Sequence, residues 1–97
     1  MILFKKQFRE NIISGKKTTT LRKNKCGVSE GKIIKTNFKD ISLKILKIEE
    51  ILKNEISESI AKSDGFVSKE KLISFLENYA PGTEKFFLVK FENLNAS

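Results

Sequence analysis

Two neighbouring runs of alternating apolar and polar residues constrain the fold of this chain more than any other feature of its sequence. The first run covers residues 31–39 and the second covers residues 41–45, with a turn expected at Lys39 and Asp40. Successive side chains of a strand point to opposite faces, so this alternation predicts two half-buried strands that pair. Alternation, in place of continuous apolar runs, favours an antiparallel sheet.

Apolar spacing and helix caps predict the remaining elements. They are a strand over 1–4, a helix over 6–14, a strand over 20–23, a helix over 54–62, a helix that begins after Ser68 and ends before Pro81, and a strand over 86–91. This order of strands and helices predicts an α+β fold. We expect a small mixed or antiparallel β-barrel, closed or half closed, with two or three short helices at its rim.

The length of 97 residues predicts one domain over residues 1–97. The single cysteine, Cys26, excludes an internal disulfide and fits a reducing, cytoplasmic setting. The apolar start of the chain is too short for a signal peptide, and no run approaches the roughly 18 apolar residues of a membrane span. We therefore expect a cytoplasmic protein with no membrane partner, and we expect it to be a monomer.

The net charge of +7 favours partners that carry phosphate. Most of the positive charge comes from lysine, and Arg9 and Arg22 are the two arginines. Lysine is the weaker sign of specific phosphate recognition, because arginine makes the bidentate contact. A lysine-rich surface also serves solubility alone. The charge predicts RNA, a nucleotide or a modified nucleoside as the partner, and it leaves the simpler interpretation open.

The absence of histidine narrows the chemistry. It excludes a Ser-His-Asp or Cys-His catalytic site, and with one cysteine it makes the usual zinc sites unattainable. The sequence also carries no Walker A motif and no dinucleotide-binding glycine pattern. An enzyme of this sequence would therefore need Lys, Asp, Glu or Tyr as its base.

Residues 14–22 place a glycine, two lysines, three threonines and an arginine within nine positions. Such a segment can arrange cations and hydroxyl groups around one small polar or anionic ligand. On residue types alone, a basic turn that leads into a threonine-rich strand is the simpler interpretation, because threonine is common in strands.

Lys17 and Thr20 lie three positions apart, so a regular strand would send their side chains to opposite faces. They can share a site only if the chain bends between them, and Gly15 makes such a bend easy. An extended segment after the bend would place Thr20 and Arg22 on one face and Leu21 in the core.

A lysine in this segment has a physical route to reactivity. Burial and neighbouring cations would depress the pKa of Lys17, and a neutral amine could take a proton from Thr20 or from water. The amine would also need a carboxylate to orient it, for which Asp64 is the candidate. The simpler interpretation of Asp64 is an Asp-Gly turn that ends a helix, and that of Arg22 is a solvated charge at a strand end.

The order of these motifs resembles the ASCH domain, a PUA-like β-barrel family. Residues 15–22 read Gly-Lys-Lys-Thr-Thr-Thr-Leu-Arg after a helical segment, residues 30–31 read Glu-Gly at the start of a strand, and residues 64–66 read Asp-Gly-Phe before the last helix. A phenylalanine-rich strand closes the chain. The resemblance covers about residues 2–92 and implies a cleft, between the barrel and the motif helices, that suits a nucleoside, a nucleotide or an RNA end.

Within the family the chain is most similar to small single-domain members that include 4-N-acetylcytidine amidohydrolases, which release acetate from the modified nucleoside. The resemblance implies that Lys17 is the base or activator, that Thr20 is the nucleophile, and that Asp64 stands where those enzymes carry a glutamate. It implies no metal and no cofactor. The residues expected to bind the ligand are Lys16, Thr18 and Arg22.

Three functions are compatible with the sequence. The first is the amidohydrolase, and the second is a non-catalytic module that holds RNA or a nucleotide, with Lys16, Lys17 and Arg22 at the phosphate. The replacement of the family's glutamate by aspartate is harmless to the second function but not to the first. The third is an RNA-cleaving protein in which lysine and aspartate would act as the paired acid and base.

Overall fold

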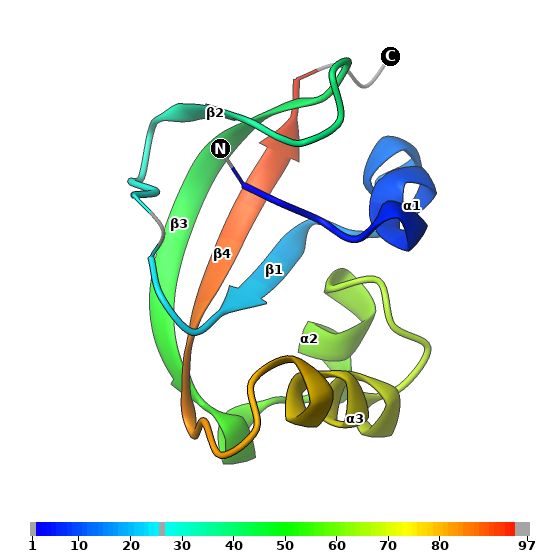
Figure 1. The fold of residues 1–97 in the computed structure, drawn as a ribbon, viewed down its shortest axis with the longest axis vertical. Helices are drawn as coiled ribbons and strands as arrows, with labels where there is room; N and C mark the ends of the chain where they lie inside the picture. The colour runs from blue at the N-terminus through cyan, green and yellow to red at the C-terminus, as the bar shows by residue number, and fades with distance from the viewer. Residues whose placement is uncertain (1, 26, 95–97) are drawn as a thin grey trace.

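The computed structural model describes residues 2–25 and 27–94, so Met1 and Cys26 lie outside the described residues. Figure 1 shows a curled sheet with short helices along one side. The elements in chain order are η1 (Lys6–Phe8), α1 (Arg9–Ser14), β1 (Thr19–Arg22), β2 (Ile33–Lys35), β3 (Ser42–Leu52), η2 (Lys53–Glu55), α2 (Glu58–Ser63), α3 (Lys69–Tyr79) and β4 (Lys85–Asn93).

The four strands form one antiparallel sheet in the order β1-β4-β3-β2. The pairing of β3 with β4 shifts register between Ile45 and Lys47, and such a bulge increases local twist. In Figure 1 the long strands β3 and β4 curve together, and the short β1 lies between α1 and α2. The sheet is therefore a half-open barrel, and the prediction of an antiparallel α+β fold with short helices is confirmed.

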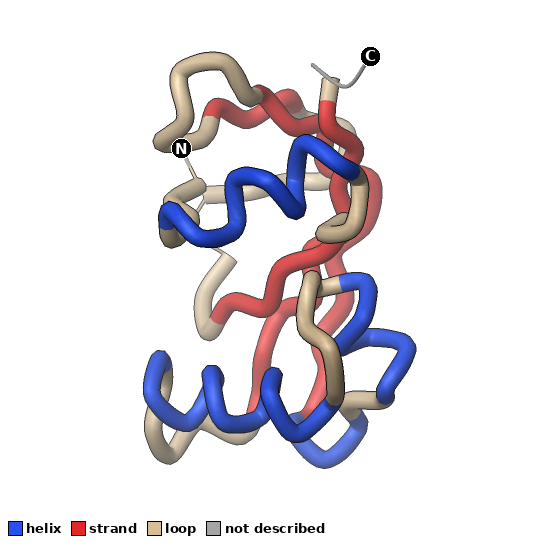
Figure 2. Tube along the Cα trace, turned by 90° about the vertical axis from the view of Figure 1, so that its right-hand side faces the viewer, coloured by secondary structure: helices blue, strands red, loops and turns tan. Residues whose placement is uncertain are grey.

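Each face of the sheet is covered by its own hydrophobic core, because alternate residues of β4 point to opposite sides. Phe86 and Leu88 belong to the core beneath α2 and α3, whereas Val89 and Phe91 belong to the core beneath the N-terminal segment and α1. Figure 2 shows α1 and the α2–α3 pair at separate levels along the sheet. The strand β1 runs between these two groups of helices.

The expected hairpin and helices are present, with shifted ends. β3 continues to Leu52, well beyond the predicted end at 45, because the bulge lets the strand bend and follow β4. The predicted helix over 54–62 is split into η2 and α2, where the Ser57 hydroxyl accepts a hydrogen bond from the Ile60 N–H. Ser68 caps α3 as predicted, with its hydroxyl accepting from the Lys71 N–H.

The predicted strand over 1–4 is wrong beyond Ile2, which forms a single parallel bridge with Thr36. The main chain of Phe4 pairs with a side chain instead of with a strand. Its N–H donates to Oδ1 of Asn37 at 2.8 Å, and its carbonyl accepts from Nδ2 of Asn37 at 2.9 Å. The amide side chain of Asn37 therefore satisfies both main-chain hydrogen-bonding groups of Phe4. The alternation of apolar and polar residues carries no information about such a contact.

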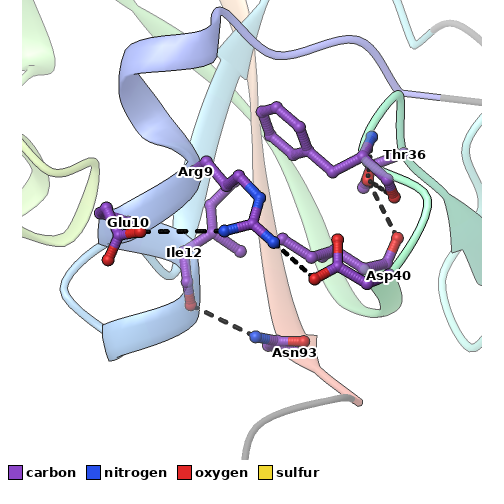
Figure 3. A network of polar contacts seen from close by, with 8 residues as sticks. Arg9, Glu10, Ile12, Thr36, Asp40 and Asn93 are labelled. Carbon is purple, nitrogen blue, oxygen red and sulfur yellow. Dashed lines mark hydrogen bonds and ion pairs between the residues drawn. The ribbon is translucent and has the colours of Figure 1, made fainter.

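Polar contacts link α1 to the turn between β2 and β3 and to the end of β4, as Figure 3 shows. The guanidinium of Arg9 contacts Asp40, which lies in the turn between β2 and β3, and also lies 3.8 Å from Glu10. Nδ2 of Asn93, at the end of β4, donates to the Ile12 carbonyl at 3.4 Å. These contacts fix α1, and with it the start of the motif that follows.

Candidate functional site

A bend between α1 and β1 carries Lys17 into the protein. Gly15 ends α1 in the left-handed conformation, with φ of 82°, as the sequence predicts for a glycine cap. The N–H of Lys17 then donates to the Asn11 carbonyl at 2.9 Å, and Lys17 forms an isolated bridge with Asp64. Only after this bridge does the chain enter β1.

Asp64 reaches the same place from the end of α2. Gly65, with φ of 92°, turns the chain there, and a Cβ on it would lie 3.3 Å from Cβ of Lys17 and 3.2 Å from Nδ2 of Asn11. The backbone angle thus favours glycine, and the close approach of Lys17 leaves little room for a larger residue. The Asp-Gly turn ends the helix, as the simpler interpretation held, and it also brings the carboxylate to the lysine.

The amine of Lys17 and the carboxylate of Asp64 form a buried ion pair. Nζ donates to the main-chain carbonyl of Asp64 at 2.8 Å and lies 3.3 Å from Oδ2, while each side chain is about 95% buried or more. Nζ also lies 4.6 Å from the centre of the Phe8 ring, within cation–π range. The lysine is therefore held on several sides.

Burial acts on both charges of this pair. Loss of solvent lowers the pKa of Lys17 and raises the pKa of Asp64, and the attraction between the two groups opposes both shifts. The positive charge of Arg22 lowers the pKa of Lys17 further. The net shift of each group therefore favours its uncharged form.

A pocket of about 90 Å³ opens next to the pair, and Lys17, Thr20, Arg22 and Asp64 line it. The N-terminal segment, η1 and α3 supply its other walls. These are Leu3, Phe4, Lys5, Phe8, Leu21, Phe75, Leu76 and Tyr79. Phe75 and Tyr79 stack at 6.1 Å with an angle of 16° between their planes, and the Lys5 amine lies 5.1 Å from the centre of the Phe75 ring.

Thr20 lies in the pocket, but the predicted convergence of three groups is incomplete. The residue is buried and lines the same cavity as Lys17 and Asp64. In the part of the chain that the structure describes, its hydroxyl makes no hydrogen bond with either of them. Thr19 takes that place, since its Oγ1 donates to Oδ1 of Asp64 at 3.1 Å and lies 3.2 Å from the Ser63 hydroxyl.

The alternation of side chains along β1 explains why Thr19, and not Thr20, contacts Asp64. Thr20 and Arg22 lie opposite Val89 and Phe87 of β4, so they face the N-terminal core, whereas Thr19 and Leu21 face the side of α2. The predicted faces of Thr20, Arg22 and Leu21 are therefore observed. The sequence analysis did not identify Thr19 as a partner of Asp64. The available signal was its spacing of two from Lys17, which places both side chains on the same face of an extended segment.

The predicted ligand-binding residues separate into two groups. Arg22 is half-buried, donates through Nη2 to the Leu3 carbonyl at 2.6 Å, and lies 5.0 Å from the centre of the Phe4 ring. Lys16 and Thr18 are exposed and do not line this pocket. The main chain of Thr18 is structural, because its N–H donates to the Ser63 carbonyl and its carbonyl accepts from the Phe91 N–H.

Sequence reasoning missed the aromatic walls. The stripe of Leu72, Phe75, Leu76 and Tyr79 was recognised as the buried face of a helix, and Leu72 and Leu76 are indeed fully buried. Phe75 and Tyr79 lie further out on that stripe and border the pocket. Among residues 2–25 and 27–94, no three His, Cys, Asp or Glu side chains gather where they could bind a metal ion, and no helix is long and apolar enough to cross a membrane.

Comparison with known proteins supports the fold. No family model and no curated protein matches the sequence. The structure is similar to that of hypothetical protein PH0355, with a TM-score of 0.78, 15% identity and 96% coverage of both chains. It is also similar to the ASCH domain from Lactobacillus crispatus, with a TM-score of 0.63 and 19% identity over 87% of this chain and 68% of that one.

A variant of ZmASCH from Zymomonas mobilis is a further structural neighbour, with a TM-score of 0.68 and 21% identity over 94% of this chain and 65% of that one. At these identities the likeness concerns the fold. The likeness extends over nearly the whole chain, so it includes both the sheet and the short helices. The chain has the α+β fold of these ASCH-domain structures, as its sequence motifs predicted.

Proposed function

We propose that this protein binds a nucleobase in the pocket beside Lys17 and Asp64. The observation that carries the proposal is the combination of aromatic walls, rim cations and a buried polar pair in one cavity. A base needs aromatic surfaces along its flat faces and a few fixed polar groups at its edge. The Phe75–Tyr79 stack and Phe4 supply the surfaces, and Lys17, Asp64 and Thr20 supply the polar groups.

The size of the pocket indicates how a nucleotide would lie. A water molecule needs roughly 10–15 Å³ of such space, so the cavity of about 90 Å³ has room for a group of base size and not for the attached sugar and phosphate. Those parts would remain at the rim, where Lys5 and Arg22 carry positive charge. The net charge of +7 favours the approach of such an anion.

Equilibrium titration of the protein with cytidine, its 5′-monophosphate and 4-N-acetylcytidine tests this proposal. We expect saturable binding, and we expect the monophosphate to bind more weakly as salt rises, because phosphate contacts release counterions. Tyr79→Ala should weaken binding of all three compounds, and the exposed Lys16→Gln should not. Failure of every nucleoside and nucleotide to bind would refute the proposal.

A second candidate, hydrolysis of an acylated base such as 4-N-acetylcytidine, is favoured by one observation. Lys17, whose pKa is lowered by burial, lines the same cavity as the Thr20 hydroxyl, which makes no hydrogen bond with the Lys17–Asp64 pair. Binding of a substrate between them would bring amine and hydroxyl to the acyl group. Apo geometry at a general base is often looser than in the complex.

In this reaction neutral Lys17 takes the Thr20 proton as the hydroxyl oxygen attacks the acetyl carbon. The C–N bond then breaks, and the exocyclic nitrogen leaves as the amine of cytidine with the proton from Lys17. Water hydrolyses the acetyl–threonine ester and releases acetate. Asp64 stabilises the ammonium form of Lys17 during the cycle. Release of cytidine by the wild type, lost in Lys17→Ala and Thr20→Ala, is the expected result, and full activity in either variant would refute the mechanism.

A further inference from the structure

We infer that a second base-binding site lies at Phe87, so that the ligand is a single-stranded nucleic-acid segment of at least two nucleotides. This inference rests on the proposed binding of a base in the pocket beside Lys17. It extends that proposal by naming the class of ligand, and it concerns a part of the surface to which no role has been assigned above.

Phe87 differs from the other phenylalanines of the chain. All eight lie in the described part of the sequence, and seven belong to one of the two hydrophobic cores or pack against it. Phe87 does neither and is half-buried on β4. An aromatic side chain that contributes to no core is available to stack against a ligand.

A cation already accompanies this ring. Nζ of Lys25 lies 5.6 Å from the centre of Phe87, and both residues line a shallow hollow together with Val28 and Ile48. Binding sites for single-stranded nucleic acid combine an aromatic platform with positive charge in this way. The hollow also contains two carboxylates, and both are engaged. Glu30 accepts from the Ile48 N–H at 2.9 Å, and Glu50 lies 3.8 Å from the Lys85 amine.

Arg22 lies between the two sites. It is the register partner of Phe87 in the β1–β4 pair, so both side chains are on the same face of the sheet as Thr20. Its guanidinium lies 5.0 Å from the centre of the Phe4 ring in the first pocket. A phosphate that links two nucleotides would therefore pass beside the positive charge of this arginine.

The experiment is a titration of the protein, by calorimetry at low salt, with a ribonucleoside monophosphate, its dinucleotide and its trinucleotide, for each of the four bases. Stacking of a second base is worth enough that we expect the best dinucleotide to bind about tenfold more tightly than its mononucleotide. The trinucleotide should add little. Phe87→Leu should reduce the dinucleotide to the affinity of the mononucleotide, and Phe87→Tyr should keep the difference.

Matched variants separate stacking from charge and from misfolding. Lys25→Gln should weaken the dinucleotide more than the mononucleotide, whereas Lys44→Gln, which removes an exposed charge from β3, should affect both lengths equally. Unchanged mononucleotide affinity in Phe87→Leu shows that the variant is folded. If mononucleotides bind and a second nucleotide adds nothing, or if Phe87→Leu and Lys25→Gln both keep the gain, the second site is refuted while the first pocket stands. If no length binds, both proposals fail.

Discussion

The Lys17 amine donates to the main-chain carbonyl of Asp64 at 2.8 Å and lies 3.3 Å from the carboxylate of the same residue. One residue thus supplies both the acceptor that positions the lysine and the charge that neutralises it. Because an aspartate side chain is short, this double contact requires the two backbones to lie close together, and Gly65 allows that approach.

Removal of one partner of this pair should destabilise the protein. Asp64→Ala leaves the ammonium of Lys17 buried and uncompensated, which costs about 3–5 kcal/mol in other proteins. We expect a loss of that size in the free energy of unfolding, measured by urea denaturation. The double variant Lys17→Met with Asp64→Ala should lose less than the sum of the two single variants. Lys16→Met, at an exposed position, is the control and should change little.

The stability that depends on Lys17 should rise with pH. Burial lowers the pKa of Lys17 below its ordinary value of 10.5, so over the range just below 10.5 the unfolded chain binds more protons than the folded one. The free energy of unfolding therefore increases with pH over that range. The difference in this free energy between wild type and Lys17→Met, followed from pH 8 to about 10.5, should grow. A difference that stays flat or shrinks would contradict the lowered pKa.

Thr19 and Thr20 should respond differently to the same substitution. Thr19→Val removes the hydroxyl that donates to Oδ1 of Asp64 and leaves a buried acceptor short of a partner, at a cost of about 1–3 kcal/mol. Thr20→Val removes no hydrogen bond to the ion pair and should have a smaller effect on thermal stability. If the protein hydrolyses an acyl group, the order reverses for activity, and Thr20→Val should be inactive. Equal stability losses would argue against the role of Thr19.

Gly65→Ala should destabilise the protein more than Gly82→Ala. Both glycines have positive φ, at 92° and 79°, so both substitutions carry backbone strain of about 1–3 kcal/mol. A Cβ at Gly65 would also press on Lys17 and Asn11, whereas none of the surrounding atoms lies within 4 Å of a Cβ at Gly82. Urea denaturation of both variants measures the difference. A larger loss at Gly82 would show that the close approach is not tight.

The sequence predicted the fold well because its signals are local. Alternation identified the β2–β3 pair, and Gly15 and Ser68 marked helix ends that the structure confirms. The length of β3 was missed because a bulge displaces the alternation by one residue beyond Ile45. The segment around Phe4 was misassigned because its hydrogen bonds go to the side chain of Asn37, which lies 33 positions away.

The site was predicted in part for the same reason. Lys17, Thr20 and Arg22 occur in one short motif, so their shared cavity followed from a bend and from strand parity. The contact of Thr19 with Asp64 joins two segments, and its geometry depends on how α2 docks beside β1. Lys16 and Thr18 were expected at the ligand from their charge and hydroxyl, but the bend that buries Lys17 leaves both of them at the surface.

The isolated bridge between Lys17 and Asp64 joins two segments that are 47 positions apart in the sequence. Next to it, the Thr18 N–H donates a hydrogen bond to the Ser63 carbonyl. Neither half of the polypeptide can form the cavity alone, because its walls come from residues 3–22 and from residues 64–79. Partial opening that frees α2 from β1 would dismantle the recognition surface while most of the sheet persisted. Ligand binding would then slow hydrogen exchange of the Thr18 amide more than that of any amide in β3 or β4. The reason is that a bound ligand requires the contact between β1 and α2 to stay closed.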